Sequence, residues 1–241
     1  MTILDELADY ARVRTAEAKK KRSPEEVKKA ALALPKGDYR FETALKKPGI
    51  SFICECKKAS PSKGLIAPEF PYLEIAKAYE AAGADCISVL TEPKWFLDFT
   101  VDEYMIYEAK LLGASAVLLI CSILNEEELK HYMAVCEELG LSALVEAHDA
   151  EEVEMALRAG ARIIGVNNRN LKDFTVNTDN SKKLREMIPP EVIFVSESGV
   201  KGSEDVAALR EIGADAVLVG ETLMRAEDKT EMLAKLRGGQ L

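Results

Sequence analysis

The stretch that decides the fold is ISFIC at residues 50–54, followed directly by ECKKASPSKG at residues 55–64. The first five residues form a short apolar run rich in β-branched and aromatic side chains, which predicts a buried strand. Strand residues two apart point to the same face, so Glu55 and Lys57 project together from the end of this strand. Burying such a pair is costly unless it is paired or used. We therefore favour a working site here over a structural ion pair.

Outward from this run, the same pattern repeats along the chain. Apolar strand-like runs alternate with amphipathic helical stretches, and joints such as Ala82-Gly83-Ala84 end the helices. A single alternating series predicts parallel strands with right-handed crossovers. The predicted strands are Ile50–Cys56, Asp85–Thr91, Ser115–Cys121, Ser142–Glu146, Arg162–Asn167, Val192–Glu197 and Asp215–Gly220. The predicted helices between them include Tyr72–Ala82, Val101–Leu112, Asn125–Leu139, Ala150–Ala159 and Glu204–Ile212.

Polar side chains follow nearly every predicted strand. In a (β/α)8 barrel these carboxyl ends meet at one face, which holds the active site. A doubly wound open sheet would rarely gather polar ends from so many strands, and it would favour a Gly-rich first turn. We predict an α/β fold of the (β/α)8 TIM barrel class, as a single domain over residues 1–241. Residues 1–45 form a helical extension, in which Ser23 and Pro24 begin a helix.

The bulk composition narrows the class of protein. The 241 residues are 48% hydrophobic and 30% charged, with a formal net charge of −9. Such a balance argues against nucleic acid as a partner, although a local basic cleft could still bind an anionic substrate. No apolar stretch reaches the roughly 20 residues that a bilayer span needs, and the N-terminus lacks the order of a signal peptide. We expect a cytoplasmic protein without membrane contact; the sequence specifies no oligomer, and a monomer is the expectation.

The reactive residue types are sparse. Four of the five cysteines lie in or at the ends of strand-like runs, which predicts buried thiols. The two histidines, His131 and His148, form no zinc-binding or nucleophilic grouping with other residues. We expect neither a metal site nor a nucleophilic mechanism.

The number of predicted strands differs from that of a complete barrel. Seven strands are readable rather than eight, and between Thr91 and Ser115 there is room for one loop and one helix only. A full barrel would need a further helix and strand there. The junction is WFLDFT at residues 95–100.

Five motifs stand in order at five strand ends. They are E-x-K-x-x-S-P-S at residues 55–62, SVLTE-x-x-x-F at 88–96, IGVNNRNL at 164–171, SESG at 196–199 and VGETLM at 219–224. Together they resemble the indole-3-glycerol phosphate synthase family of tryptophan biosynthesis, nearly end to end. Any one motif alone would be a weak signal, whereas five in order are specific.

The resemblance implies a reaction. That family converts 1-(o-carboxyphenylamino)-1-deoxyribulose 5-phosphate to indole-3-glycerol phosphate, carbon dioxide and water, without a cofactor. The implied partner is thus a phosphorylated small molecule. Ring closure needs an acid at the ketone and hydroxyl, a base to finish the dehydration, and fixed positive charge near the anionic groups.

The resemblance also implies residue roles. Glu55 and Lys57 correspond to the first-strand carboxylate and lysine, and Glu146 to the general base. Asn167 would bind substrate hydroxyl or carboxylate groups, while Glu197 and Ser198 would contact substrate and organise the site. The remaining implied positions are Ser60, Gly199, Gly220 and Glu221 for the phosphate, Arg169 as a brace, and Phe96 stacked on the anthranilate ring.

Each position also has a plainer interpretation. Glu146 could be a salt-bridged rim residue, and Asn167 with Asn168 could simply form a turn. SESG at 196–199 could be a helix cap, Gly220 a tight turn, and Phe96 a packing residue.

The chain departs from the family at one point. The family's third strand ends in Lys-Asp-Phe, and its lysine is taken as the general acid; here Leu97 precedes Asp98 and Phe99. Losing a positioned acid costs on the order of 10²–10⁴ in rate. The missing helix and strand have three possible explanations: a segment left out of the written sequence, a deletion, or a degenerate paralogue. We favour the first. Competing functions are a related phosphate-binding barrel, such as phosphoribosylanthranilate isomerase or the tryptophan synthase α subunit, and a barrel that binds a sugar phosphate without turnover.

Overall fold

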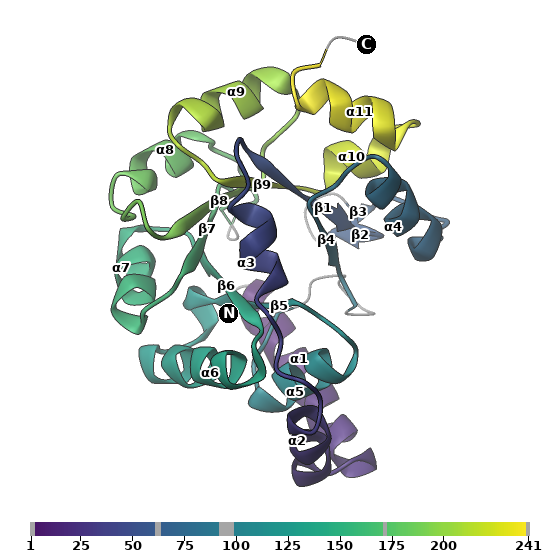
Figure 1. Cartoon of the computed structure of the whole chain (residues 1–241), viewed down its shortest axis with the longest axis vertical. Coiled ribbons are helices and arrows are strands. Elements are labelled where there is room, and N and C mark those ends of the chain that lie inside the picture. Colours follow the sequence, from purple (N-terminus) through teal and green to yellow (C-terminus); the bar gives the residue numbers. More distant parts are fainter. Residues whose placement is uncertain (1–2, 61–63, 92–98, 171–172, 240–241) are drawn as a thin grey trace.

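A curled sheet of seven parallel strands, surrounded by helices, forms the body of the protein (Figure 1). This is a computed structural model, which describes residues 3–60, 64–91, 99–170 and 173–239. The strands are β1 (Ser51–Cys56), β4 (Cys86–Val89), β5 (Ala116–Ile120), β6 (Ser142–Ala147), β7 (Ile163–Asn167), β8 (Ile193–Glu197) and β9 (Ala216–Val219). The helices after the first strand are α4 (Tyr72–Ala81), α5 (Glu103–Leu111), α6 (Glu126–Leu139), α7 (Ala150–Ala159), α8 (Asp179–Arg185), α9 (Ser203–Glu211), α10 (Glu221–Arg225) and α11 (Lys229–Leu236).

The strand order is that of a barrel opened along one side. Neighbours run β4-β1-β9-β8-β7-β6-β5, and all six pairings between them are parallel. Each predicted strand contains the observed one, except that β6 extends one residue further, to Ala147. The prediction of an α/β barrel with seven strands is confirmed.

The opening lies between β4 and β5, where the sequence left room for only a loop and a helix. Both are edge strands, and no pairing joins them in the described part of the chain. Ile87 of β4 shares the face of its β1 neighbour Cys54, which points to the helix layer, yet Ile87 is 37% exposed and Val89 45%. Cys54 itself is fully buried. The side of β4 that a further helix would cover is therefore partly bare.

The residues at the junction itself are only partly described. Leu97 and Asp98 lie within residues 92–98, outside the described residues, so their separation gives no test. In the full sequence of 241 residues, Asp98 follows Leu97 directly. Just after the junction, the Thr100 N–H donates to the Leu118 carbonyl at 3.0 Å, so the chain runs beside β5 as it enters α5.

Burial on both faces explains why the strands read as apolar runs. All six residues of β1 are buried. An inner cluster fills the ring with Ile53, Leu144, Ile163, Ile193, Val195, Ala216 and, from helix α3 (Arg40–Leu45), Leu45. Helix α3 crosses the end of the ring in Figure 1. It thereby closes the end opposite to the carboxyl ends of the strands.

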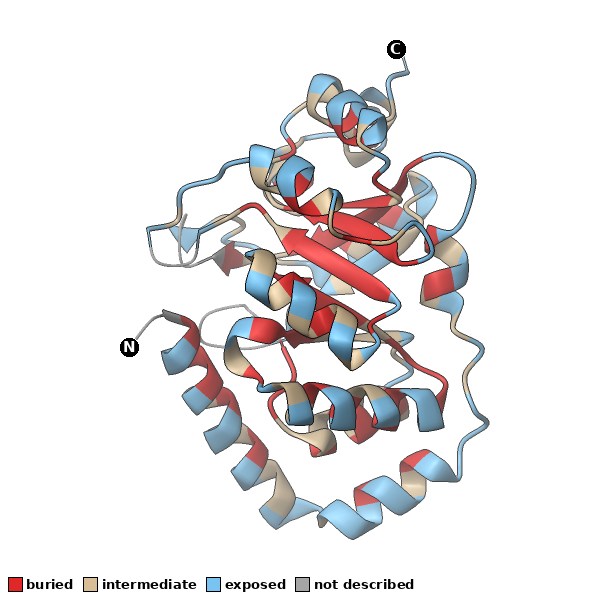
Figure 2. Cartoon of the chain, turned by 90° about the vertical axis from the view of Figure 1, so that its left-hand side faces the viewer, coloured by how far each residue is buried: buried red, intermediate tan, exposed pale blue. Residues whose placement is uncertain are grey.

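The N-terminal extension contains α1 (Ile3–Lys21) and α2 (Pro24–Leu32), with the predicted Ser23 cap present as a capping box with Glu26. Helix α1 buries one face and exposes the other to solvent (Figure 2). Its buried side packs on the segment after the junction and on β5, in a cluster of Leu4, Leu7, Ala8, Ala11, Phe99, Val101 and Ile120.

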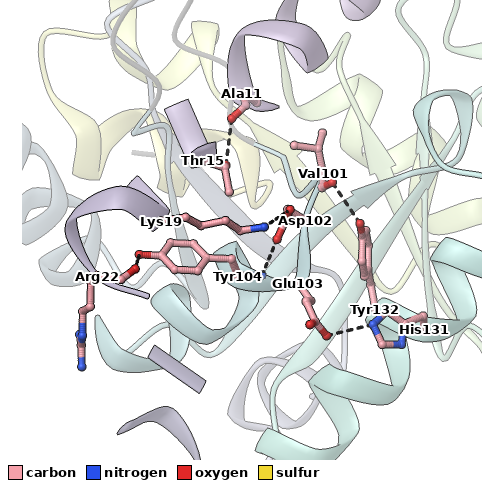
Figure 3. A network of polar contacts seen from close by, with 10 residues as sticks. All are labelled: Ala11, Thr15, Lys19, Arg22, Val101, Asp102, Glu103, Tyr104, His131 and Tyr132. Atoms are coloured by element: carbon pink, nitrogen blue, oxygen red, sulfur yellow. Dashed lines mark hydrogen bonds and ion pairs between the residues drawn. The ribbon is translucent and has the colours of Figure 1, made fainter. Parts of the chain in front are cut away.

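Polar contacts fix the same junction (Figure 3). Lys19 Nζ of α1 lies 2.6 Å from Asp102 Oδ2, and Asp102 also caps α5 by accepting from the Tyr104 N–H at 2.9 Å. The Tyr104 hydroxyl donates to the Arg22 carbonyl at 3.2 Å. From α6, the Tyr132 hydroxyl donates to the Val101 carbonyl at 3.0 Å. The extension thus holds the chain where it re-enters the barrel.

Candidate active site

A cavity of about 1350 Å³ opens at the carboxyl ends of the strands. It also reaches Phe41 of α3 at the other end of the ring, and Ile87 and Val117 beside the opening. Ten of the twelve predicted site residues line it: Glu55, Lys57, Glu146, Asn167, Arg169, Glu197, Ser198, Gly199, Gly220 and Glu221. Of the other two, Ser60 ends β2 (Ala59–Ser60), which pairs with β3 (Gly64–Leu65), and its side chain lies outside the described part of the structure. Phe96 lies outside the described residues.

Glu55 and Lys57 form an ion pair at the end of β1. Lys57 Nζ lies 2.6 Å from Glu55 Oε2, and the Glu55 side chain is 8% exposed. Glu55 Oε2 has no hydrogen-bond partner among the described residues, so this contact is an ion pair without hydrogen-bond geometry. Gly220, at the start of α10, leaves room for this carboxylate, because a Cβ there would collide with Glu55 Oε2. The glycine that the sequence suggested for phosphate binding therefore also accommodates Glu55.

Glu197 is buried among the other acids at the end of β8. Burial raises the pKa of Glu197 well above its ordinary value; the charge of Glu146, a hydrogen bond with it, and the charge of Glu55 act in the same direction, while Lys57 opposes them. Glu197 Oε1 has no hydrogen-bond partner among the described residues. This carboxyl group therefore favours its protonated form and can donate a proton into the cavity.

Gly165 of β7 makes this arrangement possible. A Cβ at Gly165 would collide with Glu197 Oε1. Gly165 pairs with Val195 on β8 and with Glu146 on β6, so it lies between the two strands that carry the acids. The absence of a side chain at this position lets the Glu197 carboxyl group lie flat against the sheet beside Glu146.

Glu146, at the end of β6, has a neighbour that the sequence analysis missed. His148 Nε2 lies 3.3 Å from Glu146 Oε1, and His148 Nδ1 lies 3.1 Å from Glu152 Oε2. Burial lowers the pKa of His148, but the hydrogen bond to Glu152 and the charges of Glu146, Glu152 and Asp149 outweigh it, so the net shift is upward. The signal was present as E-x-H with a glutamate four residues further on, at the start of a predicted helix.

The two adjacent asparagines in the turn after β7 have different roles. Asn167 Oδ1 accepts from the Arg169 N–H at 3.0 Å, so this side chain does help to form the turn, while it also lines the cavity. Buried Asn168 joins three segments: its Nδ2 donates to Ser196 Oγ and to the Ser198 carbonyl, both at 3.1 Å, and its Oδ1 accepts from the Ser181 N–H at 3.0 Å. Asn168 holds the ends of β7 and β8 and the start of α8 together.

The loop after β8 has an unusual backbone. Ser198 and Gly199 both adopt positive φ, of 65° and 99°. A Cβ at Gly199 would lie 2.8 Å from Thr178 Cγ2, so glycine is required by space as well as by backbone conformation. The Thr222 hydroxyl of α10 donates to the Val200 carbonyl at 2.6 Å, which joins this loop to the Gly220-Glu221 turn. Residues of both turns therefore line the same cavity.

Other chemistry has less support in the described part of the chain. Burial raises the pKa of the Cys54 and Cys121 thiols to about 12, and that of Cys56 and half-buried Cys86 to about 11, which is the inert state of a thiol. No group of three or more metal-ligating side chains forms among the described residues. No described helix is long and apolar enough to cross a bilayer.

Comparison with known folds supports the architecture alone. A structure described as "Native KDPGal structure" aligns with a TM-score of 0.56 at 17% identity, covering 79% of this chain and 93% of that one. Thiamine phosphate pyrophosphorylase from Pyrococcus furiosus aligns with a TM-score of 0.56 at 16% identity, covering 78% and 94%. At these identities the likeness concerns the fold.

Sequence comparison is far closer. A family model described as indole-3-glycerol phosphate synthase matches residues 4–98 and 96–236. The indole-3-glycerol phosphate synthase of Ruminiclostridium cellulolyticum is 52% identical over 257 aligned positions, covering 98% of this chain and 99% of the relative. That of Leuconostoc mesenteroides is 51% identical over 233 positions, covering 88% and 89%.

The comparisons also locate the missing unit. The two blocks of the family match meet at residues 96–98, and the 257 positions aligned with the Ruminiclostridium relative exceed the 241 residues of this chain. The relative therefore carries residues with no counterpart here, and the family match breaks where the sheet is open. On both sides of this break, the chain belongs to the indole-3-glycerol phosphate synthase family.

Proposed function

We propose that this protein closes the indole ring of 1-(o-carboxyphenylamino)-1-deoxyribulose 5-phosphate, releasing carbon dioxide and water. The observation that supports this most directly is the family match along almost the whole chain. The cavity agrees with it, because three buried carboxyl groups and a lysine lie at the strand ends where such chemistry needs acids, bases and fixed charge.

We assign the residue roles that the family resemblance implies, and the geometry supports them as follows. Glu146 acts as the base that completes the dehydration, since it borders the cavity beside His148. Lys57, paired with Glu55, supplies positive charge for the substrate carboxylate. Asn167 binds substrate hydroxyl groups, with Arg169 as the brace of that turn. Glu197 and Ser198 contact substrate from β8, and Glu197 brings a proton.

The phosphate binds at the loops that follow β8 and β9. Ser198-Gly199 and Gly220-Glu221 offer backbone N–H groups at this edge of the cavity, which suits a phosphate. Ser60 of β2 would reach the same phosphate from the first loop, and Phe96 would stack on the anthranilate ring. The reaction needs no cofactor in this scheme.

A second function has a specific observation in its favour. The acid lysine of the family has no counterpart before Asp98, where Leu97 stands, and the sheet is open at the same place. A leucine cannot donate a proton, so a barrel that binds the sugar phosphate with weak or absent turnover is the alternative.

Turnover and binding separate the two functions. The purified chain is incubated with the substrate while indole fluorescence and released carbon dioxide are followed, and thermal unfolding is measured with and without substrate. Product formation above the uncatalysed rate supports the synthase. A rise in unfolding temperature without product supports the binding barrel, and neither effect would refute both.

Three coarser expectations accompany this proposal. The chain forms one domain, it acts as a monomer, and it works in the cytoplasm with the other enzymes that handle such soluble phosphates. Light scattering on a sizing column checks the second, with 26.5 kDa expected for a monomer. A mass near twice that value would overturn it.

A further inference from the structure

His148 lies between two carboxylates, and the ring nitrogens divide between them. Nε2 faces Glu146 Oε1 at 3.3 Å on one side, and Nδ1 faces Glu152 Oε2 at 3.1 Å on the other. A neutral imidazole carries a single N–H, whereas the imidazolium carries two and can donate to both neighbours. Ionised carboxylates only accept. Nδ1 contacts Glu152 within hydrogen-bond distance, while the Nε2 contact with Glu146 lacks hydrogen-bond alignment, so it is the acidic surroundings that favour a positively charged ring.

The ring is held in place from several directions. Glu152 Oε2 also accepts from the His148 backbone N–H at 2.7 Å, so one carboxylate oxygen fixes both the ring and the chain. The Glu152 N–H donates to the Asp149 cap at 3.0 Å, which ties this glutamate into the first turn of α7. From α8, Asn180 Nδ2 donates to the His148 carbonyl at 3.0 Å. With its side chain 16% exposed, the ring has little freedom to turn away from Glu146.

The surroundings are acidic on every packed side. The ionisable groups that bear on the ring are Glu146 from β6, and Asp149 and Glu152 from α7. The Cys121 thiol, at the end of β5, experiences the same three acids, and burial with their charges raises its pKa to about 12, so it stays neutral. Glu197, whose pKa is raised well above its ordinary value by burial and by the charge of Glu146, lies next to Glu146. The net upward shift of the His148 pKa agrees with the geometry.

We propose that His148 is the positioning residue of Glu146: its ring, anchored by Glu152, holds the Glu146 carboxyl group directed at the cavity. The contact of His148 Nε2 with Glu146 Oε1 is an ion pair without hydrogen-bond geometry. It therefore leaves the Glu146 carboxylate able to accept a hydrogen bond from the substrate. Glu146 accepts the proton lost in the dehydration and returns it to water after product leaves. The kinetic part of this inference rests on the proposed ring closure, while the charge of His148 does not.

The first test does not require turnover. The chain has only two histidines, so ¹⁵N-histidine labelling yields two pairs of ring nitrogen signals, with exposed His131 beside Glu103 as the internal control. His148 is expected to titrate at higher pH than an unperturbed imidazole, because the carboxylates around it favour the charged ring. Glu152→Gln should move its titration to lower pH most strongly, and Glu146→Gln less so, while the signals of His131 should not respond to either change. A His148 titration at or below that of an unperturbed imidazole, or one unaffected by Glu146→Gln, would overturn the proposal.

The second test uses kinetics on the full chain. His148→Gln is expected to lower kcat by about tenfold with little change in KM, because a positioned base contributes roughly 10²–10⁴ and only part of that depends on its neighbour. Its pH–rate profile should differ from that of the wild type, since a titratable ring beside Glu146 has been removed. His131→Gln is the matched control and should leave kcat unchanged. An unchanged kcat and profile in His148→Gln would refute the positioning role. If the wild-type chain shows no turnover, the proposed function fails, and the His148 proposal is judged by the ring titrations alone.

Discussion

The paired arc of the sheet and the opening between β4 and β5 respond differently to the loss of one βα unit. In the arc, β1, β9, β8, β7 and β6 each pair on both sides, and they carry Glu55, Glu197 and Glu146 at their ends. At the opening, β4 exposes Ile87 and Val89. Strand pairing is local, so a missing unit bares its own neighbours and leaves the register of the other strands intact. Most of the catalytic geometry can therefore persist while one acid is absent.

The largest expected effect comes from closing the opening. We expect that inserting the corresponding helix–strand segment of the Ruminiclostridium relative between Leu97 and Asp98, ending in the family lysine, raises turnover by on the order of 10²–10⁴, since it restores a positioned acid. The same insertion ending in methionine is the control and should restore stability but not rate. Equal rates for both insertions would mean that another group, such as Glu197, already supplies the acid.

A smaller loss of rate is expected within the arc itself. Glu146→Gln should lower turnover by at least tenfold with the fold retained, because the amide cannot accept the proton, and a general base contributes roughly 10²–10⁴. Steady-state kinetics with circular dichroism checks both parts. Glu154→Gln on the exposed face of α7 is the matched control. A near-normal rate in Glu146→Gln would remove this residue from the role of base.

The contrast in burial predicts a contrast in stability between two isoleucines. Ile164 of β7 is fully buried, whereas Ile87 of β4 is 37% exposed. We expect Ile164→Ala to lower the free energy of unfolding by about 2–5 kcal/mol, and Ile87→Ala by about 1 kcal/mol or less. Denaturant titration of both variants measures the difference. Similar losses at the two positions would show that β4 is covered in solution.

A glycine in the arc tests how closely the acids are packed. Gly165→Ala places a Cβ against Glu197, so we expect a loss of about 1–3 kcal/mol in stability together with reduced turnover. Gly202→Ala meets no atom within 4 Å and serves as the control. If both variants behave alike, the Glu197 carboxyl group is not held against β7.

The smallest expected effect is the loss of folding stability caused by burying the Glu197 carboxyl group. Because the folded-state pKa of Glu197 is raised, its contribution to stability is lost as pH rises from the ordinary glutamate range through the folded value. The melting temperature of Glu197→Gln should therefore exceed that of the wild type at pH 8. The difference should be about 2–4 °C for each kcal/mol by which the free energy of unfolding rises. The difference should vanish near pH 4, where Glu197 is protonated in both states. Scanning calorimetry at the two pH values measures it, and an equal gain at both would point to packing rather than charge.

The strands of the molecule can be predicted well from the sequence, for a physical reason. Strands buried on both faces leave near-continuous apolar runs, so all seven were found, and Glu55 with Lys57 was placed on one face by the two-residue period alone. The need for glycine at 165 could not be foreseen, because the collision with Glu197 depends on the register between two strands about 30 residues apart. His148 was missed although Glu146 and Glu152 stand near it in the sequence, because that spacing alone does not show that both carboxylates face the ring. Its role depends on the packing of α7 against β6.

The docking of α1 has a consequence for synthesis of the chain. The apolar side of α1, with Leu4 and Leu7, packs in a cluster whose other described members lie between Phe99 and Ile123, and its Lys19 pairs with Asp102. A ribosome adding about 5–20 residues per second needs roughly 5 to 20 s to pass from the end of α1 to Tyr132, which completes that junction. During that interval the first helix emerges with its partner still unmade. The N-terminus, although synthesised first, is thus among the last parts to reach its place, and a nascent chain paused before residue 99 would present α1 to chaperones.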